Sequence, residues 1–101
     1  MDRRKQLHSE LLTIGVASVH FQPPPNVHLV FPSIVYRRKS IDTISADNRS
    51  YKNQTLYQLE LIDPNPDTPF VDDLLEKFSM IKHVNNFKSD NLNHDVFDLY
   101  Y

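Results

Sequence analysis

Alternating side chains between residues 55 and 63 constrain the fold of this sequence more than any other feature. One set faces one way and the intervening set faces the other: Thr55, Tyr57, Leu59 and Leu61 against Leu56, Gln58, Glu60 and Ile62. Successive residues of a β-strand point to opposite faces of a sheet, whereas the side chains of a helix repeat about every 3.6 residues. The segment therefore predicts a strand, and the rest of the chain has to supply its partners.

Four further segments are predicted as strands. They are a short apolar run at residues 16–21, a segment rich in β-branched and aromatic residues at 27–38, and the closing runs 81–87 and 96–101. Pro32 interrupts the second of them, and a proline cannot donate to a strand ladder. We expect that strand either to begin after the proline, at residues 33–38, or to lie on a sheet edge. The turn-rich residues 88–95 are expected to connect the last two strands.

Helical periodicity occurs in two segments. Residues 2–14 carry leucines and an isoleucine at helical spacing, and predict an amphipathic helix that ends near Gly15. The pair Thr68-Pro69 supplies a capping residue and a proline suited to the first helical position. Together with the apolar spacing that follows, this pair predicts a second helix over residues 69–79.

The order of these elements predicts an α+β fold. Strands outnumber helices, and strand pairs joined without a helix have to be antiparallel. We therefore expect a mostly antiparallel β-sheet with two helices packed on one face. The 101 residues fit a single domain, 1–101, because no linker divides them and the chain is too short for two cores.

Residues 39–53 are polar and lie between two predicted strands. They predict a long β-hairpin arm in the form of an extended loop. Hairpin loops usually have about two to five residues, and longer loops in compact domains tend to be functional or mobile. We expect this arm to have low order in the free subunit and to become ordered against a partner.

The composition excludes several kinds of chemistry. The chain has no cysteine, so it has neither disulfides nor thiolate ligands and nucleophiles. A single glycine excludes the glycine-rich phosphate loops. None of the five histidines forms a pair at the spacing that places two imidazoles on one helical face. We accordingly predict no catalytic residue, no cofactor-binding residue and no metal site, and no enzymatic activity.

One cluster of metal-type donors needs a separate interpretation. Asn93, His94 and Asp95 follow Asp90, and together they offer oxygen and nitrogen ligands. Side chains such as those of Asp90, Asn91 and Asn93 also commonly bond the backbone of their own turn. We favour the turn interpretation over a metal site.

Basic residues gather at two places, residues 3–5 and 37–39, the second of them beside Tyr36. A nucleic-acid-binding domain usually has a high isoelectric point or a continuous basic stripe, but the isoelectric point here is about 6.2. The sequence therefore disfavours nucleic-acid contact and favours a strand end that runs into solvent.

No apolar run approaches the roughly 20 residues that a membrane helix needs. The first residues, 1–10, are too polar for a signal peptide. We expect no membrane association, and we expect the protein to be made in, and remain in, the cytoplasm of the producing cell.

Charge is divided unevenly along the chain. Residues 1–52 carry eight Lys/Arg against four Asp/Glu, a net charge of +4, whereas residues 53–101 carry three against nine, a net charge of −6. Such halves either cancel within one fold or give identical subunits complementary patches. The aromatic run 96–101 is expected to be an inner strand or to pair with a second chain, and the thin core favours a subunit that oligomerises.

Several sequence blocks resemble a group of small bacteriophage virion proteins from the neck and tail gene cluster. The blocks are residues 20–24, 31–36, 61–67 and above all Asp-Asn-Leu-Asn-His-Asp-Val-Phe-Asp-Leu-Tyr-Tyr at 90–101. Within that cluster the element order is similar to the tail terminator, or tail-completion, proteins of long-tailed phages. Head-closure, adaptor and other neck-ring proteins are similar in size and stay open as alternatives, with a small nucleic-acid-binding domain as the rival class.

The resemblance implies a structural function without catalysis, metal or cofactor. It implies a homo-oligomeric ring, a hexamer, which closes the tail tube and joins it to the head-completion or connector protein. The expected location is the neck of the virion. Residues that we expect at interfaces come from the charged halves, the arm and the closing strand: Arg37, Arg38, Lys39, Asp42, Asp47, Arg49, Tyr51, Asp72, Asp73, Tyr100 and Tyr101.

Overall fold

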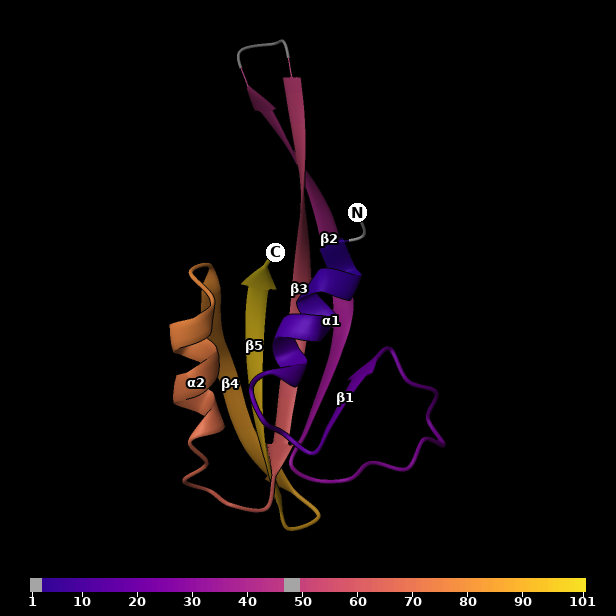
Figure 1. Cartoon of the computed structure of the whole chain (residues 1–101), viewed down its shortest axis with the longest axis vertical. Helices are drawn as coiled ribbons and strands as arrows, with labels where there is room; N and C mark the ends of the chain where they lie inside the picture. The colour runs from indigo at the N-terminus through magenta and orange to yellow at the C-terminus, as the bar shows by residue number, and fades with distance from the viewer. Residues whose placement is uncertain (1–2, 47–49) are drawn as a thin grey trace.

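The structure, a computed structural model, describes residues 3–46 and 50–101, with side chains apart from those of 42–46 and 50–53. Its elements are α1 (Arg3–Leu12), β1 (Ser18–Phe21), β2 (Ser33–Ala46), β3 (Ser50–Asp63), α2 (Phe70–Lys77), β4 (Ile81–Ser89) and β5 (Leu92–Tyr100). The strands form one sheet in the order β1-β2-β3-β5-β4 (Figure 1). In the described part of the chain β1 pairs with β2 in parallel, and the other neighbouring strands pair antiparallel.

Both helices cover the same face of the sheet, as the sequence predicted (Figure 1). Leu7 and Leu11 of α1 and Leu74 of α2 are fully buried there, and Phe78 just after α2 joins them. They pack on apolar side chains of β2, β3 and β5: Ile34, Tyr36, Tyr57, Leu59, Leu61, Phe97 and Leu99. We call this face of the sheet the helix-covered face. The burial of its apolar side chains away from water makes the main stabilising contribution to the fold. The opposite face, which neither helix covers, is called the open face below.

The boundaries of the helices agree with the sequence to within two residues, apart from Asp2, which lies outside the described residues. The chain leaves α1 through Gly15, whose φ of +106° suits a residue without a side chain. Before α2, the Thr68 hydroxyl accepts a hydrogen bond of 3.3 Å from the backbone N–H of Phe70. No helix in the described ranges is long and apolar enough to cross a membrane.

β2 and β3 form a long hairpin that extends past the rest of the sheet. Their pairing runs from Ser33 opposite Ile62 to Ala46 opposite Ser50, whereas the pairing of β3 with β5 stops at Leu56 opposite Tyr100. The part beyond Leu56 is called the arm below, and it gives the molecule extents of 50 × 26 × 23 Å (Figure 1).

The predicted hairpin arm is confirmed, but the expectation of an extended loop over residues 39–53 is wrong. The strands continue to Ala46 and resume at Ser50. A ribbon that covers no core has no need for alternating apolar residues, so its pattern resembles that of a loop. The segment 47–49 lies outside the described residues, and the low order expected of the free arm stays a prediction.

The hairpin of β4 and β5 is tighter than predicted. Instead of a connection over residues 88–95, the strands are joined by Asp90 and Asn91 alone, at φ values of +52° and +63°. Two left-handed residues in succession match the twist of a hairpin, and Asp and Asn tolerate that conformation. The polar residues that follow belong to β5, because side chains on other strands and loops satisfy them.

β5 is an inner strand, flanked by β3 and β4. Phe97 and Leu99 are fully buried, and the ring of Tyr101 packs edge-on against Phe78 at 6.0 Å between centroids. The first of the two alternatives for this aromatic strand is therefore correct. Its aromatic residues are covered within the chain, so they no longer argue for a second subunit.

Candidate interaction site

The sheet order places the two charged halves of the chain on opposite sides of the molecule. α1 packs beside β1 and β2, whereas α2 packs beside β4, so the first half occupies one side and the second half the other (Figure 1). The two halves meet between β2 and β3. Among the described side chains, the basic residues of the first half and the acidic residues of the second half therefore lie mostly on different sides, although Lys39 reaches Asp98 of the second half.

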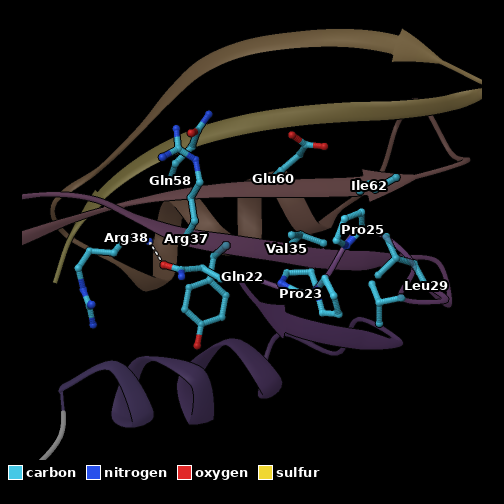
Figure 2. A pocket seen from close by; sticks show the side chains of 13 residues that line it. Gln22, Pro23, Pro25, Leu29, Val35, Arg37, Arg38, Gln58, Glu60 and Ile62 are labelled. Atoms are coloured by element: carbon cyan, nitrogen blue, oxygen red, sulfur yellow. Dashed lines mark hydrogen bonds between the residues drawn. The ribbon is translucent and has the colours of Figure 1, made fainter.

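Arg37 lies on the open face of β2, directly opposite Gln58 of β3. Its side chain is exposed and forms no hydrogen bond or ion pair with the described residues. Figure 2 shows Arg37 projecting to the same side as Gln58 and Glu60, and Arg38 projecting the other way, towards α1. The alternation of a strand thus divides the predicted basic cluster between two faces.

Arg38 joins a group of cations and aromatic rings beside α1. Its guanidinium carbon lies 5.9 Å from the ring centroid of Phe21, and that of Arg4 lies 4.6 Å from the same ring. The hydroxyl of Tyr36 shares a hydrogen bond of 2.7 Å with Nδ1 of His8. Burial, followed by the nearby charge of Arg4 and by His20, lowers the pKa of His8. The two basic segments of the sequence therefore meet, through Arg4 and Arg38, around one phenylalanine.

Lys39 is already paired within the chain. It lies where the register of β2 and β3 shifts, between Arg38 and Ser40, and its Nζ is 3.3 Å from Oδ2 of Asp98 on β5. The pair is partly exposed, so its stabilising contribution is small, at most about 1 kcal/mol. Of the three basic residues 37–39, Arg37 presents the least engaged charge.

A groove of about 800 Å³ lies between the open face and the loop that connects β1 to β2 (Figure 2). Pro23, Pro25 and Leu29 of the loop form one wall, and Val35 and Ile62 form the apolar floor. One end of the groove is lined by Arg37, Arg38 and Gln58, and of these Arg37 projects to the same side as Gln58, whereas the side chain of Arg38 points towards α1. The triplet of prolines stiffens the loop, because each fixes its own φ and restricts the residue before it. The groove is thus a site of apolar character with positive charge at one end.

Two histidine–carboxylate pairs occupy β5 and its neighbours. Nδ1 of His94 is 2.8 Å from Oε2 of Glu60 on β3, and Nε2 of His83 on β4 is 3.0 Å from Oδ1 of Asp95. The ring of Phe87 stacks on His94 at 4.6 Å between centroids and 8° between planes. These contacts fix the relative positions of the three strands.

The turn interpretation of residues 90–95 is therefore wrong for Asn93, His94 and Asp95. Asn93 donates from Nδ2 to the backbone carbonyls of Asp63 and Pro64, each at 3.2 Å, and the other two bond side chains on neighbouring strands. Within the described ranges no three His, Cys, Asp or Glu side chains gather in a way that could hold a metal ion. Their partners are distant in sequence, so only the register of the sheet could have identified them.

Tyr101 is held against α1 rather than presented to a partner. Its hydroxyl donates to the carboxylate of Glu10, and the guanidinium carbon of Arg3 lies 4.1 Å from its ring centroid. Burial, and then the hydrogen bond to Glu10, raise the pKa of Tyr101 to about 12. Tyr100 is half-buried, and its backbone N–H donates to the carbonyl of Met80 at 3.1 Å.

The remaining predicted interface residues divide between α2 and the arm. Asp72 and Asp73 are exposed in the first turn of α2, where their negative charges interact favourably with the helix dipole. Asp42 and Tyr51 belong to the arm strands, but their side chains are not among those described. Asp47 and Arg49 lie outside the described residues.

Two features of the candidate site could not be predicted from the sequence. The groove depends on the loop of residues 22–32 folding back beside the open face, which no local pattern indicates. Leu75 of α2 is 38% exposed between acidic neighbours, although its spacing suggested the core. No protein-family model matches the chain, and no curated protein gives a significant match.

Proposed function

We propose that the protein is a structural subunit of a bacteriophage neck, similar to the tail terminator proteins. In this function it forms a ring, most simply a hexamer, that closes the tail tube and joins it to the head connector. The observation that carries the proposal is the β2–β3 arm, which extends from a small sheet whose two sides are oppositely charged. A ring subunit needs two unlike surfaces for its neighbours and a further surface for the structure beneath it.

The sequence blocks that resemble phage neck proteins support the proposal, because they form the parts that define this fold. Residues 90–101 supply the two-residue turn and the inner strand β5, and residues 31–36 begin β2. Residues 61–67 end β3 and lead towards α2. The resemblance thus concerns parts of β1, β2 and β3 and the whole of β5.

Deleting residues 44–49 tests the proposed function. The change shortens the arm and leaves the helix-covered core intact, so the domain should still fold. We expect unjoined heads and tails in lysates, counted by electron microscopy, and a loss of infectious particles. Lys88→Glu, an exposed change at the far hairpin, is the matched control and should assemble normally. Normal infectivity after the deletion would exclude a joining function of the arm.

The position of the ring separates the tail terminator from its relatives. A head-closure or adaptor protein would occupy the head side of the neck, whereas a terminator would contact the tail tube. A cryo-EM map of the assembled neck, with the subunits counted and their contacts assigned, distinguishes the two. A chain that is absent from the virion would contradict both.

A nucleic-acid-binding domain is the second candidate, and the cations around Phe21 favour it. Arg4 and Arg38 flank an aromatic ring, and an aromatic ring with cations is the usual platform for an unpaired base. The net charge of −2 opposes binding of a polyanion. Fluorescence anisotropy with a labelled single-stranded oligonucleotide at low salt tests this function, and Phe21→Ala with Arg38→Ala should abolish any binding that it requires.

A further inference from the structure

The groove on the open face accepts an apolar side chain flanked by negative charge. Its walls and floor are proline, leucine, valine and isoleucine side chains, and Arg37 and Arg38 line one end. Glu60 also lines the groove, but its carboxylate bonds His94 at 2.8 Å. Arg37 is exposed and bonds none of the described side chains, so a ligand meets an unbalanced positive charge beside an apolar surface.

The outward face of α2 has the complementary character. Leu75 and Glu76 lie three and four positions after Asp72, so each of them neighbours Asp72 on the helix surface. All three are exposed, and Leu75 is 38% exposed although it is a large apolar residue. This surface of α2 therefore presents one exposed leucine beside two carboxylates.

The groove and this face of α2 lie on opposite sides of the molecule. The groove lies on the open face at the β1 and β2 side, whereas α2 covers the other face beside β4 (Figure 1). One molecule cannot satisfy both surfaces by itself. Identical molecules joined through two unlike surfaces form a head-to-tail chain or, where the rotation closes, a ring.

We propose that the groove binds the outward face of α2 from a second copy of this chain. Leu75 enters between the proline wall and the floor, and Arg37 meets Asp72 and Glu76. The proposal rests on the proposed ring function and names its subunit contact. A second copy fits better than a polyanion because the chain as a whole has a net charge of −2. Both surfaces of the proposed contact consist of described residues, and each offers an apolar part with charge opposite to that of the other.

Complementary charge reversals test this contact by sedimentation velocity at low salt. Arg37→Glu places an acidic groove opposite an acidic helix, and Asp72→Lys with Glu76→Lys places a basic helix opposite a basic groove. We expect each protein alone to associate at least about tenfold more weakly than the wild type, a change of about 1.4 kcal/mol. An equimolar mixture should recover association to within about threefold, because each reversed surface then meets its complement.

Two further measurements guard against unfolding and general charge effects. Leu75→Asp should abolish association, whereas Leu12→Asp, at an exposed leucine of α1, should not. Lys88→Glu makes the same charge change as Arg37→Glu at a residue that lines neither surface, and should associate as the wild type does. The defect of Arg37→Glu should fade in about 1 M salt, where the screening length is about 3 Å. Circular dichroism checks that each variant folds.

Three outcomes would overturn the contact. They are a wild-type protein that stays monomeric at about 1 mM, the weak end of specific association; a mixture of the reversed variants that stays monomeric; and oligonucleotide binding that Arg37→Glu removes. The test is independent of the neck function. A monomeric chain whose arm deletion still blocks head–tail joining refutes the contact alone, whereas restored association with infectious arm-deleted particles refutes the neck function alone.

Discussion

The two faces of one sheet are built by different means, although the same strands supply both. On the helix-covered face, β3 contributes Tyr57, Leu59 and Leu61, which are almost completely buried. On the open face it contributes Gln58 and Glu60, which pair with side chains of neighbouring strands or line the groove. The first face consists of apolar side chains removed from water, whereas the second combines paired polar groups with apolar residues such as Ile62. On β3, the odd-numbered residues therefore contribute to stability, and the even-numbered residues contribute to recognition.

The largest effect is expected on the helix-covered face. Leu59→Ala removes a side chain that is 0% exposed and leaves a cavity in the buried core cluster. The free energy of unfolding should fall by about 2–5 kcal/mol. Gln58→Ala, one position away on the open face, should change it by less than about 0.5 kcal/mol. Chemical denaturation measures both, and similar losses for the two variants would refute the division between the faces.

Tyr101 makes a polar contact at the edge of the otherwise apolar helix-covered face. Tyr101→Phe removes the hydrogen bond to Glu10 and should cost about 0.5–1.5 kcal/mol. The pKa of Tyr101 is raised to about 12, above the usual value of 10 for a tyrosine. The folded state therefore retains a proton that the unfolded chain loses, and this stabilisation is complete below pH 10 and declines as the pH rises towards 12.

Ultraviolet titration of the tyrosines checks that direction. One tyrosine should ionise near pH 12 in the folded protein, and Tyr101→Phe should remove this step. A wild-type protein in which every tyrosine titrates near pH 10 would contradict the contact with Glu10. The unfolding free energy of Tyr101→Phe should also depend less on pH between 10 and 12.

The open face should show pairwise coupling in place of large single losses. Phe87 and His94 stack on each other, and a double-mutant cycle of Phe87→Ala and His94→Ala should give a coupling energy of about 0.5–1.5 kcal/mol. The same cycle between Phe87 and Gln58, which do not pair, should give a value near zero. Equal coupling in both cycles would indicate a general loss of structure.

Ser33 is a polar residue of the open face that is nevertheless buried. By parity it belongs to the open face, yet it is 0% exposed, and its hydroxyl has no hydrogen-bond partner among the described residues. A buried polar group without a partner is destabilising. Ser33→Ala should therefore raise the melting temperature, corresponding to a gain of a few tenths to about 1 kcal/mol. A lower melting temperature would mean that the hydroxyl is satisfied.

The sequence predicts the helix-covered face better than the open face. The alternation at residues 55–63 and the leucine spacing of α1 identify elements whose burial is periodic, and the α+β class is confirmed. The arm strands and the start of β5 escape prediction because they carry polar residues, which local patterns assign to loops. The partners of His94 and Asn93 lie about 30 residues away along the chain, so register decides them. The groove needs the loop of residues 22–32 to fold back, and no local pattern predicts that return.

The inner position of β5, which follows the other strands in the sequence, is expected to delay folding during synthesis. β4 is linked to the sheet only through β5 in the described chain, and β5 itself pairs with β3, which leaves the ribosome about 30 residues earlier. A nascent chain that stops before Leu92 therefore exposes the apolar sides of β3 and α2 without the strand that unites them. Such a chain is expected to be prone to aggregation until β5 has emerged. A premature stop in the last tenth of the sequence is thus expected to be as damaging as one near the middle.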